Sequence, residues 1–140
     1  MSEITMEFKM LDQQVSVSEE LPPGAIQALA DAGVELLVCN RPEHESENLP
    51  TFAELEDAAR EAGLEFAAIP FSRGQMQPTH SEAFAELLKN GKRIHAFCRT
   101  GNRSCNLWAA ARCLQGSDKR ALQAAAQKAG YDISGVLVTY

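Results

Sequence analysis

The stretch of sequence that decides the fold is Ile94-His95-Ala96-Phe97-Cys98-Arg99-Thr100-Gly101-Asn102-Arg103-Ser104. Residues 94–97 predict a short strand, and residues 104–114 predict a helix. Between them lies a polar loop that contains a glycine. A strand that turns through such a loop directly into a helix is typical of α/β folds, in which strands and helices alternate.

The rest of the chain repeats this alternation on both sides of the stretch. Strands are predicted at residues 14–17, 34–39 and 64–69, and helices at residues 22–32, 51–63, 79–88 and 118–128. Thr51 and Thr79 each precede a glutamate by three residues, which is the spacing of a capping box. Residues 131–140 fit either a short helix or a strand. The order predicts a single three-layer α/β domain over residues 1–140, with a mainly parallel central sheet flanked by helices.

Composition and charge exclude several classes of function. The chain has 140 residues, 45% of them hydrophobic, and a net charge of −6. An acidic chain is unsuited to binding the phosphate backbone of a nucleic acid. No apolar run approaches the roughly 20 residues of a membrane span, and residues 1–10 lack a signal pattern. We therefore expect a cytoplasmic protein that binds neither nucleic acid nor membrane; nothing in the sequence sets its oligomeric state.

Positive charge is nevertheless concentrated around one cysteine. Arg99, Arg103 and Arg112 follow Cys98 closely in the sequence. A basic pocket on an acidic body favours a small anionic or phosphorylated substrate over a polyanion. The four cysteines contain no C-x-x-C pair, so we expect no metal site and no cofactor, and in a cytoplasmic protein we expect the thiols to stay reduced.

The loop after Cys98 has the parts needed for covalent chemistry on an oxyanion. A sulfur at a helix N-terminus is stabilised as the thiolate by unpaired N–H groups and by the helix dipole. Gly101 lets the backbone curl around a bound ion, so that successive amides point inward. Arg103 can grip two oxygens with its planar fork, and Ser104 offers a hydroxyl to the sulfur. We therefore predict Cys98, Arg103 and Ser104 as the catalytic residues.

Other loops should meet this one, because the carboxyl ends of parallel strands lie at one edge of a sheet. Arg41 follows the strand at 34–39, and Arg73 lies in the loop after the strand at 64–69. The residues predicted to bind the substrate are accordingly Arg41, Arg73, Arg99, Thr100, Gly101 and Asn102.

On these residues the chain resembles the beta-lactamase-hydrolase-like phosphatase domain family. The likeness spans about residues 15–125 and is carried by residues 37–42, 69–70 and, most specifically, 97–104. The family is similar in fold to cysteine-dependent protein tyrosine and dual-specificity phosphatases. The resemblance implies that Cys98 is the nucleophile, Arg103 the phosphate-binding arginine and Ser104 the neighbouring hydroxyl. It implies a phosphatase that hydrolyses phosphate monoesters of the phosphotyrosine or aryl type through a phosphocysteine.

Two departures from the classical phosphatases leave alternatives open. Four residues separate Cys98 from Arg103, where classical phosphatases have five, and four is the spacing of rhodanese sulfurtransferases. The first alternative is therefore a sulfurtransferase with a Cys98 persulfide. The second departure is that residues 70–78 contain no carboxylate to act as general acid. The second alternative is therefore a non-catalytic module that binds phosphate or a phosphopeptide.

Replacement acids and a redox partner can be named from the sequence. Glu43 and His44, together with Glu45 and His80, are the candidate general acids. Cys39 ends the strand beside the predicted site, where some similar small phosphatases carry a second cysteine. A reversible disulfide between Cys39 and Cys98 would protect the nucleophile from over-oxidation.

Overall fold

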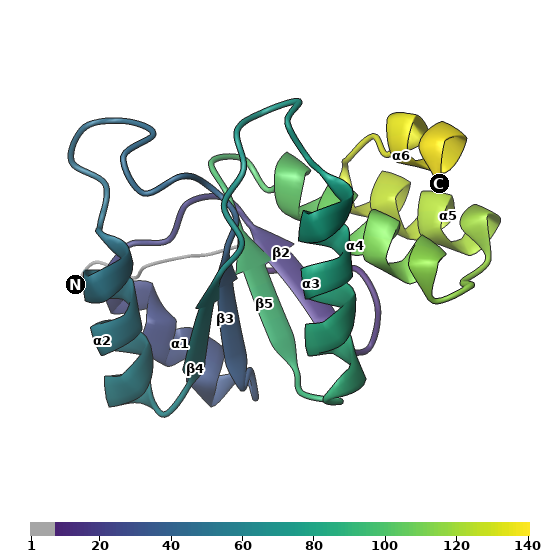
Figure 1. Ribbon diagram of the computed structural model, residues 1–140. Coiled ribbons are helices and arrows are strands. Elements are labelled where there is room, and N and C mark those ends of the chain that lie inside the picture. The colour runs from purple at the N-terminus through teal and green to yellow at the C-terminus, as the bar shows by residue number, and fades with distance from the viewer. Residues whose placement is uncertain (1–7) are drawn as a thin grey trace.

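The computed structural model describes residues 8–140, which form an α/β domain around one five-stranded sheet (Figure 1). The strands are β1 (Lys9–Met10), β2 (Val15–Ser18), β3 (Leu36–Cys39), β4 (Glu65–Ala68) and β5 (Ile94–Phe97). Their order is β1-β2-β5-β3-β4, and only the pairing of β1 with β2 is antiparallel. The mainly parallel sheet predicted from the sequence is confirmed. The two-residue strand β1 was not predicted, because it is too short to show a period.

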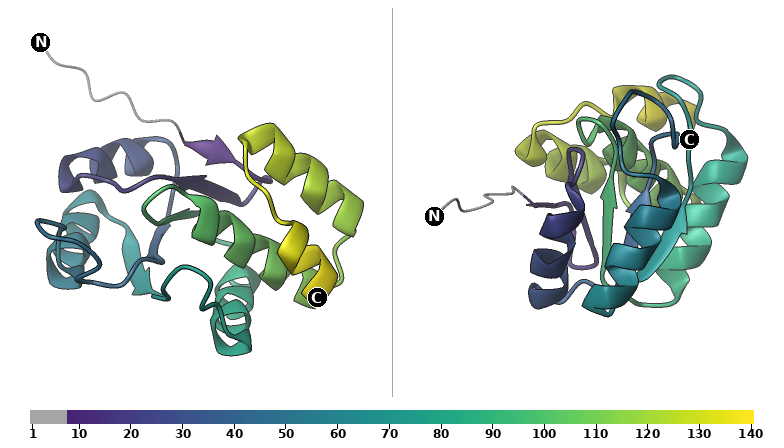
Figure 2. Two further views of the ribbon diagram at one scale, coloured as in Figure 1. Left: turned by 90° about the horizontal axis from the view of Figure 1, so that it is seen from above. Right: turned by 90° about the vertical axis from the view of Figure 1, so that its left-hand side faces the viewer.

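Helices cover both faces of the sheet and complete three layers (Figures 1 and 2). One face carries η1 (Pro23–Ala25), α1 (Ile26–Asp31) and α2 (Phe52–Ala62). The other side carries α3 (Pro78–Lys89), α4 (Asn102–Leu114), α5 (Lys119–Ala129) and α6 (Ser134–Thr139). Two separate clusters of buried apolar side chains, one on each side, hold the layers together. The three-layer arrangement is thereby confirmed, whereas the extent of the domain over residues 1–140 stays a prediction.

The helix ends test the capping predictions. At α2 the Glu54 N–H donates to Thr51 Oγ1 at 3.1 Å, which confirms the predicted capping box. The prediction that Thr79 caps the next helix is wrong, because α3 already begins at Pro78. Proline is favoured at the first helical position, since its missing N–H would have no partner there. The Gln77 N–H donates instead to His80 Nδ1 at 2.9 Å.

The last segment, for which the sequence fitted either a helix or a strand, forms the helix α6. Asp132 Oδ1 accepts the Ser134 N–H at 2.9 Å just before this helix, and Ile133 and Val136 bury their side chains against the core. Ten residues are too few to show whether apolar positions follow a period of two or of 3.6. Packing against α4 decides the outcome.

A buried histidine lies in the middle of the sheet. His95 on β5 is fully buried, and its two ring nitrogens lie 2.7 Å from Ser16 Oγ and 2.8 Å from Ser18 Oγ on β2. Burial disfavours the imidazolium and lowers the pKa of His95 to about 3. The two hydroxyls satisfy the neutral ring, so this polar group fits into an otherwise apolar layer.

Among residues 8–140, no helix is both long enough and apolar enough to cross a bilayer. The interpretation of residues 1–10 as lacking a signal pattern falls largely on residues 1–7, which lie outside the described residues. The cytoplasmic location stays a prediction.

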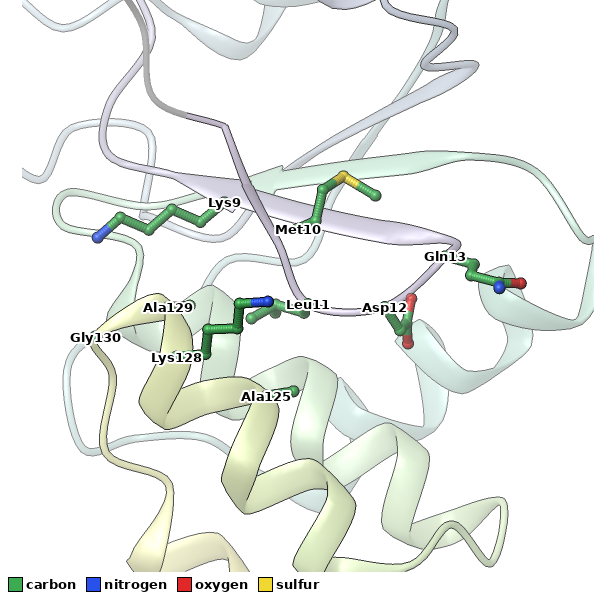
Figure 3. Close-up of a pocket in the computed structure, with 9 residues that line it drawn as sticks. All are labelled: Lys9, Met10, Leu11, Asp12, Gln13, Ala125, Lys128, Ala129 and Gly130. Carbon is green, nitrogen blue, oxygen red and sulfur yellow. The ribbon is translucent and has the colours of Figure 1, made fainter.

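Loops from three strands gather at one edge of the sheet and position the candidate site. Residues 40–51 follow β3, residues 69–77 follow β4, and residues 98–101 follow β5 (Figure 1). A cavity of about 890 Å³ lies away from this edge, between the segment that begins with β1 and helix α5 (Figure 3). It is lined by Lys9 and Lys128 from opposite sides and by Asp12, but by no part of the 98–104 stretch.

Candidate active site

Cys98 lies directly between β5 and α4, where the sequence predicted it. Its side chain is fully buried, and the Gly101 N–H donates to its Sγ at 3.1 Å. Gly101 has a φ of 95°, a backbone conformation that glycine adopts without strain. A Cβ at this position would also collide with the Tyr131 hydroxyl. Glycine therefore allows the loop to fold back far enough for an amide to reach the sulfur.

Groups outside the loop hold its carbonyl oxygens. The Tyr131 hydroxyl donates to the Thr100 carbonyl at 3.1 Å, and the Glu20 N–H donates to the Arg99 carbonyl at 3.3 Å. Within the loop, the Asn102 N–H donates to Thr100 Oγ1 at 3.3 Å. These bonds fix the path of the loop before any anion binds, which is the preorganisation that an oxyanion site needs.

Arg103 is held in a bidentate ion pair with Glu45. Its Nη1 and Nη2 each donate to one carboxylate oxygen of Glu45 at 2.7 Å, and Nη1 also donates to the Phe71 carbonyl at 3.0 Å. The hydrogen bond to Glu45 raises the pKa of Arg103, with a further contribution from the nearby Cys98 sulfur. The same bond lowers the pKa of Glu45, so Glu45 is a carboxylate at neutral pH. Sequence reasoning named Glu45 only as a candidate acid and missed this pairing.

Ser104 contacts a different partner from the one predicted. Its hydroxyl is buried and donates to Asn40 Oδ1 at 2.8 Å. Asn40 in turn donates from Nδ2 to the Ile69 carbonyl at 3.0 Å, and from its backbone N–H to the Phe97 carbonyl at 2.8 Å. Asn40 thereby ties together the ends of three strands and the start of α4. Ser104 could donate to the sulfur only if its hydroxyl turned away from Asn40.

Arg41 has no donor left for a substrate. Its side chain is fully buried and donates to both carboxylate oxygens of Glu20 and to the carbonyls of Pro42, Glu43 and Pro50. These bonds use all five N–H groups of a guanidinium. Arg41 therefore organises the loop at residues 41–50, and we correct its predicted role in binding substrate.

The prediction that Arg112 contributes to the positive charge around Cys98 is also wrong. Arg112 lies near the far end of α4, where its Nη2 is 2.9 Å from Asp12 Oδ2. Nine residues of helix separate it from Arg103 by about 13 Å along the axis. Proximity in the sequence did not bring this arginine to Cys98.

The candidate general acids Glu43 and His44 contact groups outside the Cys98 loop. The Glu43 carboxylate accepts the Phe52 N–H at 2.6 Å, at the start of α2. His44 is 81% exposed, and its Nε2 lies 3.6 Å from Glu43. The ring of His80, the other candidate outside this loop, stacks on Phe71 with 4.9 Å between ring centroids. Glu43 therefore caps the start of α2, and His80 packs against Phe71.

A cavity of about 570 Å³ opens beside the Cys98 loop. Its lining combines five predicted site residues with the partner of Arg103: Glu45, Arg73, Arg99, Thr100, Asn102 and Arg103. Three arginines face one carboxylate, so the cavity has a positive balance that suits an anion. Within residues 8–140, no group of three or more His, Cys, Asp or Glu side chains is arranged to hold a metal ion.

Cys39 is a buried neutral thiol. Its S–H donates to the Arg41 carbonyl at 3.6 Å, and burial raises its pKa to about 12. All four cysteines are free. A thiol with so high a pKa is a weak attacking group in disulfide exchange. The Cys39–Cys98 disulfide stays a prediction.

The matching family model is described as Beta-lactamase hydrolase-like protein, phosphatase-like domain, and it covers residues 7–115. The chain belongs to this family. The stretch at residues 97–104, which carried the resemblance, lies within the matched part of this phosphatase-like domain. Among curated protein sequences, none matches the chain.

Solved structures share the fold of the phosphatase-like domain. A candidate phosphatase (nma1982) from Neisseria meningitidis z2491 is 28% identical, with a TM-score of 0.81 and 94% of each chain covered. Tk-PTP in its active form is 18% identical, with a TM-score of 0.71 and 94% of each chain covered. PTPMT1 is also 18% identical with a TM-score of 0.71, covering 94% of this chain and 90% of its own. At 18% identity, the similarity to Tk-PTP and to PTPMT1 establishes the fold alone.

Proposed function

We propose that this chain is a cysteine-dependent phosphatase that hydrolyses aryl phosphate monoesters through a phosphocysteine at Cys98. The observation that carries the proposal is the contact of the Gly101 N–H with Cys98 Sγ, beside a cavity lined by Arg103. An amide that donates to the sulfur stabilises negative charge on it. Membership of the phosphatase-like family supports the same reaction.

The first step of the proposed reaction is attack on phosphorus. A P–S bond forms to Cys98 as the P–O bond to the leaving group breaks, and the leaving oxygen departs with the electron pair. The bonds of Arg103 to Glu45 and Phe71 use three of its five N–H groups. The remaining two, on Nε and Nη2, are available to the sulfur and to a phosphoryl oxygen. Loop amides stabilise the other phosphoryl oxygens.

The second step is hydrolysis of the phosphocysteine. Water attacks phosphorus, the P–S bond breaks, and inorganic phosphate leaves while the sulfur regains its electron pair. The amide of Gly101 would stabilise this leaving thiolate as it stabilised the nucleophile. The proton lost by the attacking water passes to solvent or to the phosphate itself.

Within residues 8–140, no suitable acid lines the cavity beside the Cys98 loop, and this supports aryl esters as the substrate class. Glu45 beside Arg103 has a lowered pKa, and so does Asp132, a carboxylate near the same end of α4. Both are ionised at neutral pH and are poor proton donors to a leaving oxygen. A phenoxide leaves without protonation far more easily than an alkoxide, so aryl phosphates should react faster than alkyl phosphates.

Turnover of phenyl phosphate, combined with mass spectrometry of the protein, tests this proposal. The parent should release phosphate, Cys98→Ser should not, and a quenched reaction should show one phosphoryl group on Cys98. Cys105→Ser is the matched control, because Cys105 is fully buried like Cys98 but lies within α4. The four-residue spacing of Cys98 and Arg103 favours a sulfurtransferase as second candidate, which would instead carry one sulfur atom from thiosulfate. Phosphate binding without turnover, retained in Cys98→Ser, would indicate a binding module.

A further inference from the structure

A second cavity, of about 700 Å³, adjoins the one beside Cys98. Arg73, Asn102 and Arg103 line both cavities, so the two meet at the predicted phosphate-binding residues. The second cavity extends from there between residues 71–78 and helix α6. A group attached to a phosphate held by Arg103 would therefore have a route into it.

The walls of this second cavity are largely apolar and already in place. Phe71 and Val136 are buried, and Met76 and Tyr140 pack against the same core cluster. The Tyr140 hydroxyl lies 2.9 Å from Ser81 Oγ, which fixes its ring. Preformed apolar cavities of this size hold ring-bearing ligands.

Charge is confined to the end nearest the phosphate site and to the rim. Arg73 and Arg103 lie where the two cavities meet, and the exposed Asp132 contributes a side-chain carboxylate to the lining. A leaving group with its own negative charge would lie beside Asp132, which is ionised. The lining therefore favours an uncharged apolar group.

We infer that this cavity binds the leaving group of the substrate, and that this group is an uncharged aromatic system larger than a single phenyl ring. The inference rests on the proposed phosphatase function. The phosphoryl group would sit on the residue 98–103 loop, and the rings would lie between Phe71 and Met76 on one side and Val136 on the other. Residues 130–140 supply much of this cavity, and they lie beyond the part of the chain that the family model matches.

Gly135 on α6 offers a way to fill the cavity without disturbing the fold. It lines the cavity, and a Cβ built on it meets nothing within 4 Å. Gly135→Phe should therefore place a ring where the substrate's outer ring would bind. Val138 is the matched control, because it lies on the same helix but is 88% exposed and does not line the cavity.

The test compares kcat/KM for 2-naphthyl phosphate and phenyl phosphate. We expect the parent to prefer the naphthyl ester by about tenfold, since an added apolar ring gains burial. Gly135→Phe should remove that preference, whereas Val138→Phe should retain it. Gly135→Leu, a smaller plug, should reduce the preference in part and guards against misfolding of the first variant. A parent with equal kcat/KM for both esters, or a preference that survives both substitutions of Gly135, would overturn the inference.

A binding measurement separates this inference from the proposed function. Calorimetry with Cys98→Ser compares the affinity for 2-naphthyl phosphate with that for inorganic phosphate and needs no turnover. Tighter binding of the naphthyl ester, lost on adding Gly135→Phe, supports the cavity as an aryl site even if no ester is hydrolysed. Equal affinity for the two ligands contradicts it, whatever the phosphatase assay shows.

Discussion

Glu45 and Arg103 face each other edge to edge, with both N···O distances at 2.7 Å. Glu45 belongs to the loop after β3, and Arg103 to the first turn of α4, so the pair joins two elements that are 58 residues apart. A guanidinium held at one edge by a carboxylate can present its remaining N–H groups in a fixed direction. Loss of the Glu45 carboxylate should therefore change the orientation of the Arg103 guanidinium more than it changes the stability of the fold.

Glu45→Gln should lower kcat/KM for phenyl phosphate by about tenfold, because an amide cannot accept two charge-assisted bonds from one guanidinium. The change removes one charge from a side chain that is partly exposed. Glu47→Gln is the matched control, since Glu47 lies in the same loop and is exposed. Steady-state kinetics of both variants check the prediction. Equal kcat/KM in the two variants would mean that Glu45 does not position Arg103.

Arg103→Lys should be severe although the charge is retained. A lysine cannot bond Glu45, Phe71 and a phosphoryl oxygen in one plane, so we expect kcat/KM to fall by about 100-fold or more. Arg99→Lys, at an exposed position lining the same cavity, should cost far less. Thermal unfolding of both variants separates lost chemistry from lost folding. Near-parent activity in Arg103→Lys would exclude this residue as the oxyanion clamp.

Much of the fold and part of the candidate site could be predicted from the sequence. The parallel strands follow from short apolar runs between helices, and the Cys98 loop was found because its parts are contiguous in the chain. The pairing of Glu45 with Arg103 depends on the path of an irregular loop, which no local pattern encodes. Arg41 was assigned to the substrate because it follows a strand, but its position does not reveal that its five donors are used within the protein.

Gly101→Ala should destabilise the protein and disrupt the loop. The added methyl group would face a positive φ of 95° and collide with the Tyr131 hydroxyl. Gly91→Ala is the matched control, because Gly91 has a φ of 72° but a Cβ there meets nothing within 4 Å. We expect Gly101→Ala to lower the free energy of unfolding by about 1–3 kcal/mol more than Gly91→Ala does. Urea denaturation of both variants measures the difference, and equal costs would refute the collision.

Burial of His95 should make the free energy of unfolding depend on pH, and this dependence should begin at a higher pH than the dependence caused by the carboxylates. The pKa of His95 is about 3 in the folded protein and near 6.5 when unfolded, so the unfolded chain binds more protons between these values. Stability is therefore complete above pH 6.5 and is lost as the pH falls toward 3. Asp12 and Glu45, whose pKa values are lowered from 3.8 and 4.5, contribute losses only at lower pH.

Between pH 7 and pH 5 we expect the free energy of unfolding to fall by about 2 kcal/mol because of His95. Urea denaturation at closely spaced pH values measures this slope. His95→Gln removes the titrating ring but keeps a polar side chain between Ser16 and Ser18, so it should be less stable at pH 7 and nearly independent of pH down to 5. A parent protein equally stable at pH 7 and pH 5 would show that the imidazole is not held neutral by its burial in the sheet.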